Sequence, residues 1–226
     1  NSAWTLKYYV WDGMTPYTEA KAINKTYGYD NVVDQTKDLT VVYFGDSQTQ
    51  GKAFTAPLDN SFELQRSINN ASYTGINSGV GGTSSQLGMY RLDSDVIAHN
   101  PDLVFVEFYP NDWNISGQGK DTAAANAELA KLLSYHENII KRLNALDHVP
   151  VIIYMNPMEQ SAEGEDSHNT KVVKMLSGLL SHYDIPTMDF DAYARSLIAT
   201  GEYTWDDFRI ASNNVHFTSK GGQICA

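Results

Sequence analysis

A serine in the tripeptide Gly45-Asp46-Ser47 is the residue best suited to chemistry in this chain. The tripeptide follows the apolar run 39–44, whose β-branched residues predict a buried strand that ends at the glycine. Open α/β folds place their reactive groups at the carboxyl edge of such a sheet, so the Ser47 hydroxyl is a candidate nucleophile. Because this tripeptide occurs in many turns, the interpretation depends on three later segments: Asn77-Ser78-Gly79-Val80-Gly81-Gly82, Asn111-Asp112 and His216.

In this order, the segments resemble the four motif blocks of the SGNH (GDSL-type) esterases and lipases. The blocks are Gly45-Asp46-Ser47, Asn77-x-Gly79-x-x-Gly82, Tyr109-Pro110-Asn111-Asp112 and Asn213-Asn214-Val215-His216. The resemblance covers roughly residues 37–226. It implies a three-layer α/β/α, flavodoxin-like fold with a central parallel sheet, and ester hydrolysis through an acyl-serine intermediate.

The resemblance also implies roles for the motif residues. A serine hydroxyl is a poor nucleophile unless a base takes its proton, and His216 is the candidate base for Ser47. The backbone N–H of Gly82 and the side-chain amide of Asn111 resemble the family's oxyanion donors, with the Ser47 N–H as a third. The remaining histidines are interpreted as helix or loop residues without partners: His99, His136, His148, His168 and His182.

Two positions depart from the family pattern. Tyr109 replaces the glycine of the third block, and we expect it to reshape the pocket wall and favour short acyl groups. Asn213 replaces the triad aspartate, which leaves three options open. In the first, the site is a Ser-His dyad oriented by Asn213 or by a main-chain carbonyl. In the second, a carboxylate from elsewhere, such as Asp206 or Asp207, is the acid. In the third, the activity is weak or lost. The first two options are favoured because every other block is intact.

The composition restricts the classes of function. The 226 residues carry a net charge of −11 without a Lys/Arg-rich run, which argues against nucleic-acid binding and, more weakly, against anionic membranes. The single cysteine, Cys225, excludes an intramolecular disulfide and does not fix the compartment. An extracellular or cell-surface location in a bacterium is favoured, with the cytoplasm as the alternative. No apolar stretch approaches the roughly 20 residues that span a bilayer. No ligand spacing typical of a metal site or a phosphate loop is present, so we expect no cofactor.

The pattern along the chain predicts two parts. Residues 1–36 are an aromatic-rich extension, either an arm packed on the flank or a carbohydrate-stacking surface, of which packing is favoured. Residues 37–226 are the hydrolase domain, in which strands and helices alternate as in a parallel sheet flanked by helices. The expected strands are 39–44, 73–76, 103–108, 150–154 and 186–189, and the expected helices are 60–69, 84–98, 122–146, 168–183 and 191–199. So few residues follow His216 that a last helix is very short or the chain is truncated.

The expected function is hydrolysis of small acyl esters, most plausibly O-acetyl groups on carbohydrate. The reasons are the absence of a long apolar lid segment and the aromatic N-terminal part. The substrate partner would be a small ester or a polysaccharide ester. A lipase or thioesterase is the enzymatic alternative, and a carbohydrate-binding module with decayed chemistry is the alternative from another class. Glu107 and Asp112 are interpreted as structural carboxylates at the sheet edge.

Overall fold

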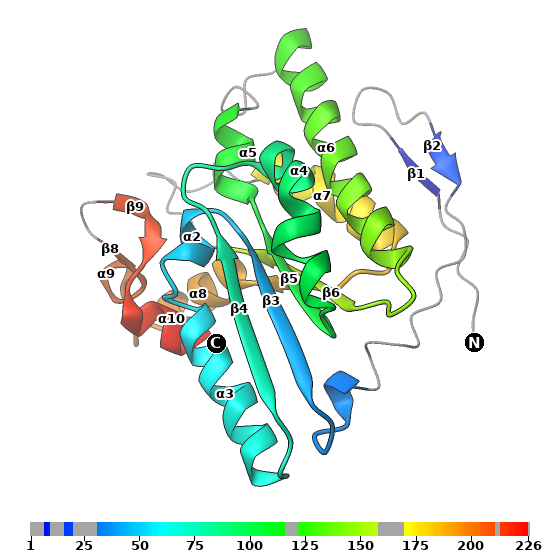
Figure 1. Cartoon of the computed structure of the whole chain (residues 1–226). Helices are drawn as coiled ribbons and strands as arrows, with labels where there is room; N and C mark the ends of the chain where they lie inside the picture. Colours follow the sequence, from blue (N-terminus) through cyan, green and yellow to red (C-terminus); the bar gives the residue numbers. More distant parts are fainter. Residues whose placement is uncertain are drawn as a thin grey trace.

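A sheet of five parallel strands forms the centre of the molecule (Figure 1). The computed structural model describes residues 7–9, 16–19, 31–115, 122–157, 170–210 and 213–225. The strand order is β4-β3-β5-β6-β7. The strands are β3 (Leu39–Gly45), β4 (Tyr73–Gly79), β5 (Leu103–Glu107), β6 (Val151–Asn156) and β7 (Thr187–Asp189). This arrangement confirms the predicted α/β fold class.

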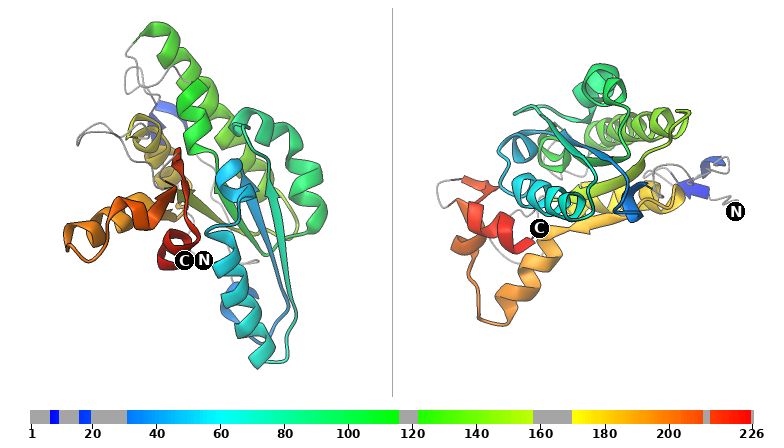
Figure 2. Two further views of the ribbon diagram at one scale, coloured as in Figure 1. Left: turned by 90° about the vertical axis from the view of Figure 1, so that its left-hand side faces the viewer. Right: turned by 60° about the horizontal axis from the view of Figure 1, so that its bottom comes forward.

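Helices cover both faces of the sheet (Figure 2). One face packs against α4 (Ser85–Asp95), α6 (Ala123–Asn144) and α7 (Thr170–His182), and the other against α3 (Thr55–Ile68), α8 (Phe190–Ala199) and α10 (Ser219–Cys225). Along β3, Val42 and Phe44 join the first hydrophobic cluster, whereas Val41 and Tyr43 join the second. Since successive side chains of a strand point to opposite faces, a strand buried on both faces is apolar throughout.

The order of the strands places the carboxyl ends of three of them together. The chain passes from β3 to β4 on one side and then crosses to β5 on the other side of β3. In the ladder, Gly45 lies opposite both Gly79 and Glu107. Ligands of open α/β sheets bind at such a reversal of strand order, outside the carboxyl ends. The loops that carry the first three motif blocks therefore begin side by side.

Short elements extend this frame. They are α2 (Ser47–Gln50), a 3₁₀ turn (Ile97–His99), α5 (Tyr109–Ile115), α9 (Trp205–Phe208), β8 (Arg209–Ile210) and β9 (Asn213–Phe217). The five expected strands and five expected helices are present, with shifted ends. The helix expected from residue 60 begins five residues earlier, at Thr55. Pro57 does not prevent this start, because it lies in the first turn, where backbone N–H groups have no intrahelical acceptor. The last helix in the described ranges is α10.

The N-terminal part contains an antiparallel pair, β1 (Lys7–Tyr9) and β2 (Pro16–Glu19). Strand β1 lies beside α7. The side chains of residues 1–30 lie outside the described part of the chain, so the choice between a packed arm and a carbohydrate-stacking surface stays a prediction. The division at residue 36 also stays a prediction. None of the helices in the described ranges is both long and apolar enough to cross a membrane.

Candidate active site

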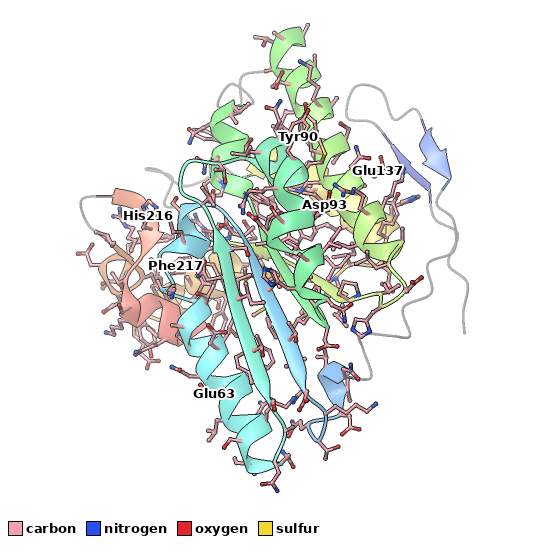
Figure 3. The ribbon with its side chains drawn as sticks, viewed as in Figure 1. Glu63, Tyr90, Asp93, Glu137, His216 and Phe217 are labelled. Carbon is pink, nitrogen blue, oxygen red and sulfur yellow. The ribbon has the colours of Figure 1, made fainter. Side chains whose placement is uncertain are left out.

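Ser47 and His216 meet at the carboxyl edge of the sheet. Ser47 is the first residue of α2, directly after β3, and His216 lies in β9. The distance between Ser47 Oγ and His216 Nε2 is 2.9 Å, although 169 positions separate the two residues. Figure 3 labels His216 on the strand next to α2. With the proton of the ring on Nδ1, Nε2 accepts a hydrogen bond from the hydroxyl, which is the geometry a general base needs.

Two glycines, Gly45 and Gly79, allow the close approach of α2 to the ends of the strands. A Cβ atom on Gly45 would lie 2.1 Å from Thr49 Oγ1 and 2.5 Å from the Glu107 carbonyl oxygen. A Cβ atom on Gly79 would lie 2.2 Å from the backbone nitrogen of Gln50. Any side chain at these positions would push α2 away from the ends of β4 and β5. The glycines therefore fix where Ser47 stands.

The His216 side chain is half-buried, and this burial favours the neutral imidazole. Burial lowers the pKa of His216, so the imidazole is neutral at neutral pH and can accept the Ser47 proton. Among the described side chains, no carboxylate contacts His216. Asn213 is the first residue of β9, at the position where the family has its acid, and its side chain lies outside the described part.

The structure does not support the aspartates that the sequence offered as alternatives to Asn213. Asp207 accepts a hydrogen bond from the Thr204 N–H (2.8 Å), which belongs to the capping box of α9, and a second from the Thr204 hydroxyl (3.1 Å). Asp207 also pairs with Lys220 at 2.6 Å, and these partners lower its pKa to about 2. Asp206 is exposed to solvent. The option that Asp207 is the acid is therefore not supported, because its oxygens bond to Thr204 and Lys220.

Backbone N–H groups beside Ser47 are open. Gly82 has φ +75°, which favours glycine, and a Cβ atom there would meet nothing within 4 Å. Within the described ranges, neither the Gly82 N–H nor the Ser47 N–H has a hydrogen-bond partner. The neighbouring Gly81 N–H donates to Gln50 Oε1 at 3.0 Å, which holds the loop against α2. The arrangement leaves two donors available to an oxyanion next to the hydroxyl.

Asn111 lies in the first turn of α5 and joins the first three motif blocks. Its Nδ2 donates to Asp46 Oδ2 at 2.7 Å and to the Thr83 carbonyl oxygen at 3.0 Å. An amide nitrogen has two hydrogens, and both are used within the protein. Asn111 can therefore donate to an oxyanion only by sharing or releasing the Thr83 contact. The role predicted for Asn111 stays a prediction with this added condition.

A buried chain of polar groups lies behind Asn111. Asp112 accepts from the backbone N–H and the hydroxyl of Ser85, and His136 Nε2 lies 2.7 Å from its other oxygen. His136 Nδ1 lies 3.2 Å from the Tyr154 hydroxyl. These contacts tie α4, α5, α6 and β6 together and agree with a structural role for Asp112.

Two of the histidines expected to lack partners have them. His136 pairs with Asp112, and His148 Nε2 lies 2.8 Å from Asp102. Both expectations were wrong. For His136 a signal was available, since it lies among the inward-facing leucines and isoleucines of α6. A buried polar group requires a hydrogen-bond partner, so that position already implied one.

Arg91 is a site residue that the sequence reasoning missed. Its guanidinium donates to the carbonyl oxygens of Gly45 and Ser78, each at 2.6 Å, and to Asp95 at 2.7 Å. It also lies 4.5 Å from the ring centroid of Phe44. Arg91 thus clamps the ends of β3 and β4, from which the first two motif blocks start. The only sequence signal was the Arg91–Asp95 spacing of four residues on a helix.

Tyr109 does not form an exposed pocket wall. Its side chain is 1% exposed and packs edge to face against Tyr154, with ring centroids 6.5 Å apart. The expectation is corrected for a local reason. The chain turns into α5 at Tyr109, and the first residue of this helix points into the core.

Replacing Tyr109 with alanine is expected to lower the free energy of unfolding by about 3–5 kcal/mol, the range for deleting a large buried ring. The acyl-chain preference should not change, because the ring presents almost no surface to a substrate. Urea unfolding and a series of p-nitrophenyl esters measure the two effects. Tyr193→Ala on α8 is the control, since its ring is 47% exposed. A shift toward longer acyl chains at unchanged stability would restore the pocket-wall interpretation.

Comparison with known proteins identifies the class. A model of the GDSL-like lipase/acylhydrolase family matches residues 43–224. The chain belongs to this family, as the four motif blocks predicted. No curated protein matches the sequence.

Several solved structures share the fold at low sequence identity. A two-domain esterase active on acetylated mannans has a TM-score of 0.66 at 18% identity, and the match covers 88% of this chain and 50% of that one. An acetyl xylan esterase has a TM-score of 0.62 at 19% identity, covering 82% and 95%. A catalytic mutant of an acetylxylan esterase from Geobacillus stearothermophilus has a TM-score of 0.63 at 15% identity, covering 82% and 90%. This chain spans about half the length of the first of these proteins.

Proposed function

We propose that this chain removes small acyl groups, most plausibly O-acetyl groups on carbohydrate, through an acyl-Ser47 intermediate. The observation that carries the proposal is the 2.9 Å contact between Ser47 Oγ and His216 Nε2 at the reversal of strand order. Neutral His216 takes the hydroxyl proton as Ser47 attacks the ester carbonyl carbon. The same proton then passes to the leaving alcohol, and water repeats the sequence to release the acid.

The negative charge on the attacked carbonyl oxygen needs hydrogen-bond donors. The N–H groups of Ser47 and Gly82 supply them without losing other partners. Asn111 joins them when its amide shares or exchanges the Thr83 carbonyl contact. His216 becomes cationic in this step, and Asn213 can orient the ring through its amide but cannot offset the charge. The dyad oriented by Asn213 is therefore the form of the site we propose.

The acetyl preference is supported by the names of the similar structures, which include esterases that act on acetylated mannan and acetylated xylan. A longer acyl group is the alternative. Exposed apolar side chains favour it: Val80, beside Gly81 in the second motif block, is 40% exposed, and Leu87 at the start of α4 is 48% exposed. These side chains offer an acyl chain some apolar contact.

A substrate panel separates these options. Acetate, butyrate and octanoate esters of p-nitrophenol are compared by kcat/KM, and acetate release is measured from acetylated xylo- and manno-oligosaccharides. The proposal expects acetate to be the preferred ester and the oligosaccharides to release acetate. Octanoate as the best substrate would favour a lipase-type enzyme. Rates no higher than those of Ser47→Ala on every substrate would indicate a binding module with decayed chemistry.

A further inference from the structure

Two acidic side chains are buried together beneath Ser47. Asp46 immediately precedes the nucleophile, and Glu107 is the last residue of β5. Both side chains are fully buried. Two adjacent carboxylates without solvent repel each other and lose hydration, so such a pair keeps a proton. The mechanism above does not use Glu107, and its state therefore needs an explanation.

The hydrogen-bond contacts of Asp46 and Glu107 indicate that one of the two carboxyl groups is protonated. Glu107 Oε2 accepts from the Thr49 hydroxyl at 3.1 Å and from the Asp46 N–H at 3.3 Å. Glu107 Oε1 is buried and has no donor among the described residues. The Asp46 N–H contact brings Glu107 Oε2 against the residue that carries the second buried carboxyl group. Two buried carboxyl groups so near each other do not both ionise, so one of them is a neutral acid.

The surroundings place that proton on Glu107. Asp46 accepts from the Gln48 N–H at 2.9 Å and from Asn111 Nδ2 at 2.7 Å, donors that favour its charged form. Burial nevertheless raises the pKa of Asp46 to about 6. Burial and the neighbouring Asp46 raise the pKa of Glu107 well above its usual range. At neutral pH the pair therefore holds one proton, on Glu107, and one negative charge, on Asp46.

We propose that Glu107 is a positioning residue that acts as a neutral carboxylic acid. It donates its proton to Asp46, and Asp46 holds both the Asn111 amide and the backbone turn that carries Ser47. If Glu107 lost this proton, two buried carboxylates would face each other, and the hold on Asn111 would loosen. The catalytic consequence rests on the proposed esterase function, whereas the shared proton does not.

The charged and titratable groups around the pair do not offset a second negative charge. Arg91 on α4 is the nearby cation, and its guanidinium is committed to Gly45, Ser78 and Asp95. On α5, the charge of Asp112 raises the pKa of Asp46. His216 on β9, bonded to Ser47, is neutral near neutral pH. The pair therefore depends on its proton.

This proton makes folding depend on pH in a defined direction. The unfolded chain releases the Glu107 proton near its ordinary pKa of 4.5, whereas the folded protein keeps it to a much higher pH. Between these two values the folded state binds more protons than the unfolded state, so the free energy of unfolding falls as pH rises. Glu107→Gln donates a similar hydrogen bond from an amide that does not titrate. Its stability advantage over the wild type should therefore grow with pH across this window.

The test uses two readouts that do not require activity. The first is the free energy of unfolding as a function of pH, and the second is the infrared C=O band of a protonated carboxyl group at neutral pH. Glu137→Gln is the matched control, because Glu137 is also buried but lies on α6 with Lys141 and Tyr183, away from His216 (Figure 3). We expect E107Q to lose the band and flatten the pH dependence, and E137Q to do neither.

Kinetics test the positioning role. Glu107→Leu cannot donate a hydrogen bond, so it should lower kcat by about 10²-fold, the loss typical of one oxyanion donor, with little change in KM. E107Q should exceed this variant in kcat. The proposal also expects the wild type to lose activity at high pH as Glu107 ionises, and E107Q should not show this loss. The proposal is overturned if E107Q keeps both the protonated band and the wild-type pH slope of stability. An inactive wild type that shows the band would leave the shared proton supported and would refute the esterase function separately.

Discussion

Ser47→Ala is expected to lower kcat by about 10⁶, the size of the loss when a serine hydrolase loses its nucleophile. The reason is that Ser47 Oγ is the hydroxyl bonded to His216 Nε2 at the edge of the sheet. A fluorophosphonate probe should label the wild-type protein on Ser47, as peptide mapping would establish, and should not label the variant. Residual hydrolysis would come from the oxyanion donors and substrate binding alone.

The control is Ser67→Ala, at an exposed position near the end of α3. This variant should keep both the wild-type kcat and the labelling of Ser47. An adduct on a different serine, or no adduct on folded wild-type protein, would remove Ser47 from its assigned role. Equal hydrolysis by the wild type and Ser47→Ala would show that the site no longer performs chemistry.

Asn213→Asp is expected to raise kcat/KM by at least tenfold, with about 10⁴ as the upper limit set by the loss of a triad carboxylate in serine proteases. The introduced charge would stabilise the cationic His216 that forms during the reaction. It would also raise the pKa of His216, which burial now lowers. Because the base must be neutral to act, the acid limb of the pH–rate profile should move to higher pH.

Two control variants make the result specific. Asn214→Asp adds the same charge one position away from the motif site and should not reproduce the gain. Asp207→Asn removes the ion pair with Lys220 and weakens the capping box of α9, so it should lower stability more than kcat. A large loss in Asn213→Ala without any gain in Asn213→Asp would show that the amide of Asn213 is itself the working third member.

The sequence predicted the parts of the site that are local in the chain. A continuous apolar run predicted β3, and the glycine at its end predicted the turn that presents Ser47. Each of the first three motif blocks directly follows a strand that the apolar pattern also predicted. Because parallel strands end at one edge of the sheet, these predictions together place the candidate active site at that edge.

The features that the sequence did not predict depend on contacts between distant segments. The Arg91 clamp and the Asp112–His136 pair join helices that no local pattern relates. The inward direction of Tyr109 depends on α5 starting at that residue, and the expected helices did not include one there. Glu107 was interpreted correctly as lying at the sheet edge, but its bond to Asp46 depends on the register of β5 against β3. Propensity and periodicity do not determine such register.

The 169 positions between Ser47 and His216 have a consequence for how activity returns during refolding. The entropic cost of closing a loop grows with its length, and contacts between distant segments form late. Helix α6 and the adjacent pair β3–β4 need only nearby residues, so circular dichroism should recover first. The hydroxyl becomes reactive only when β9 docks against α2. The rate at which fluorophosphonate labelling of Ser47 returns therefore measures the last stage of folding.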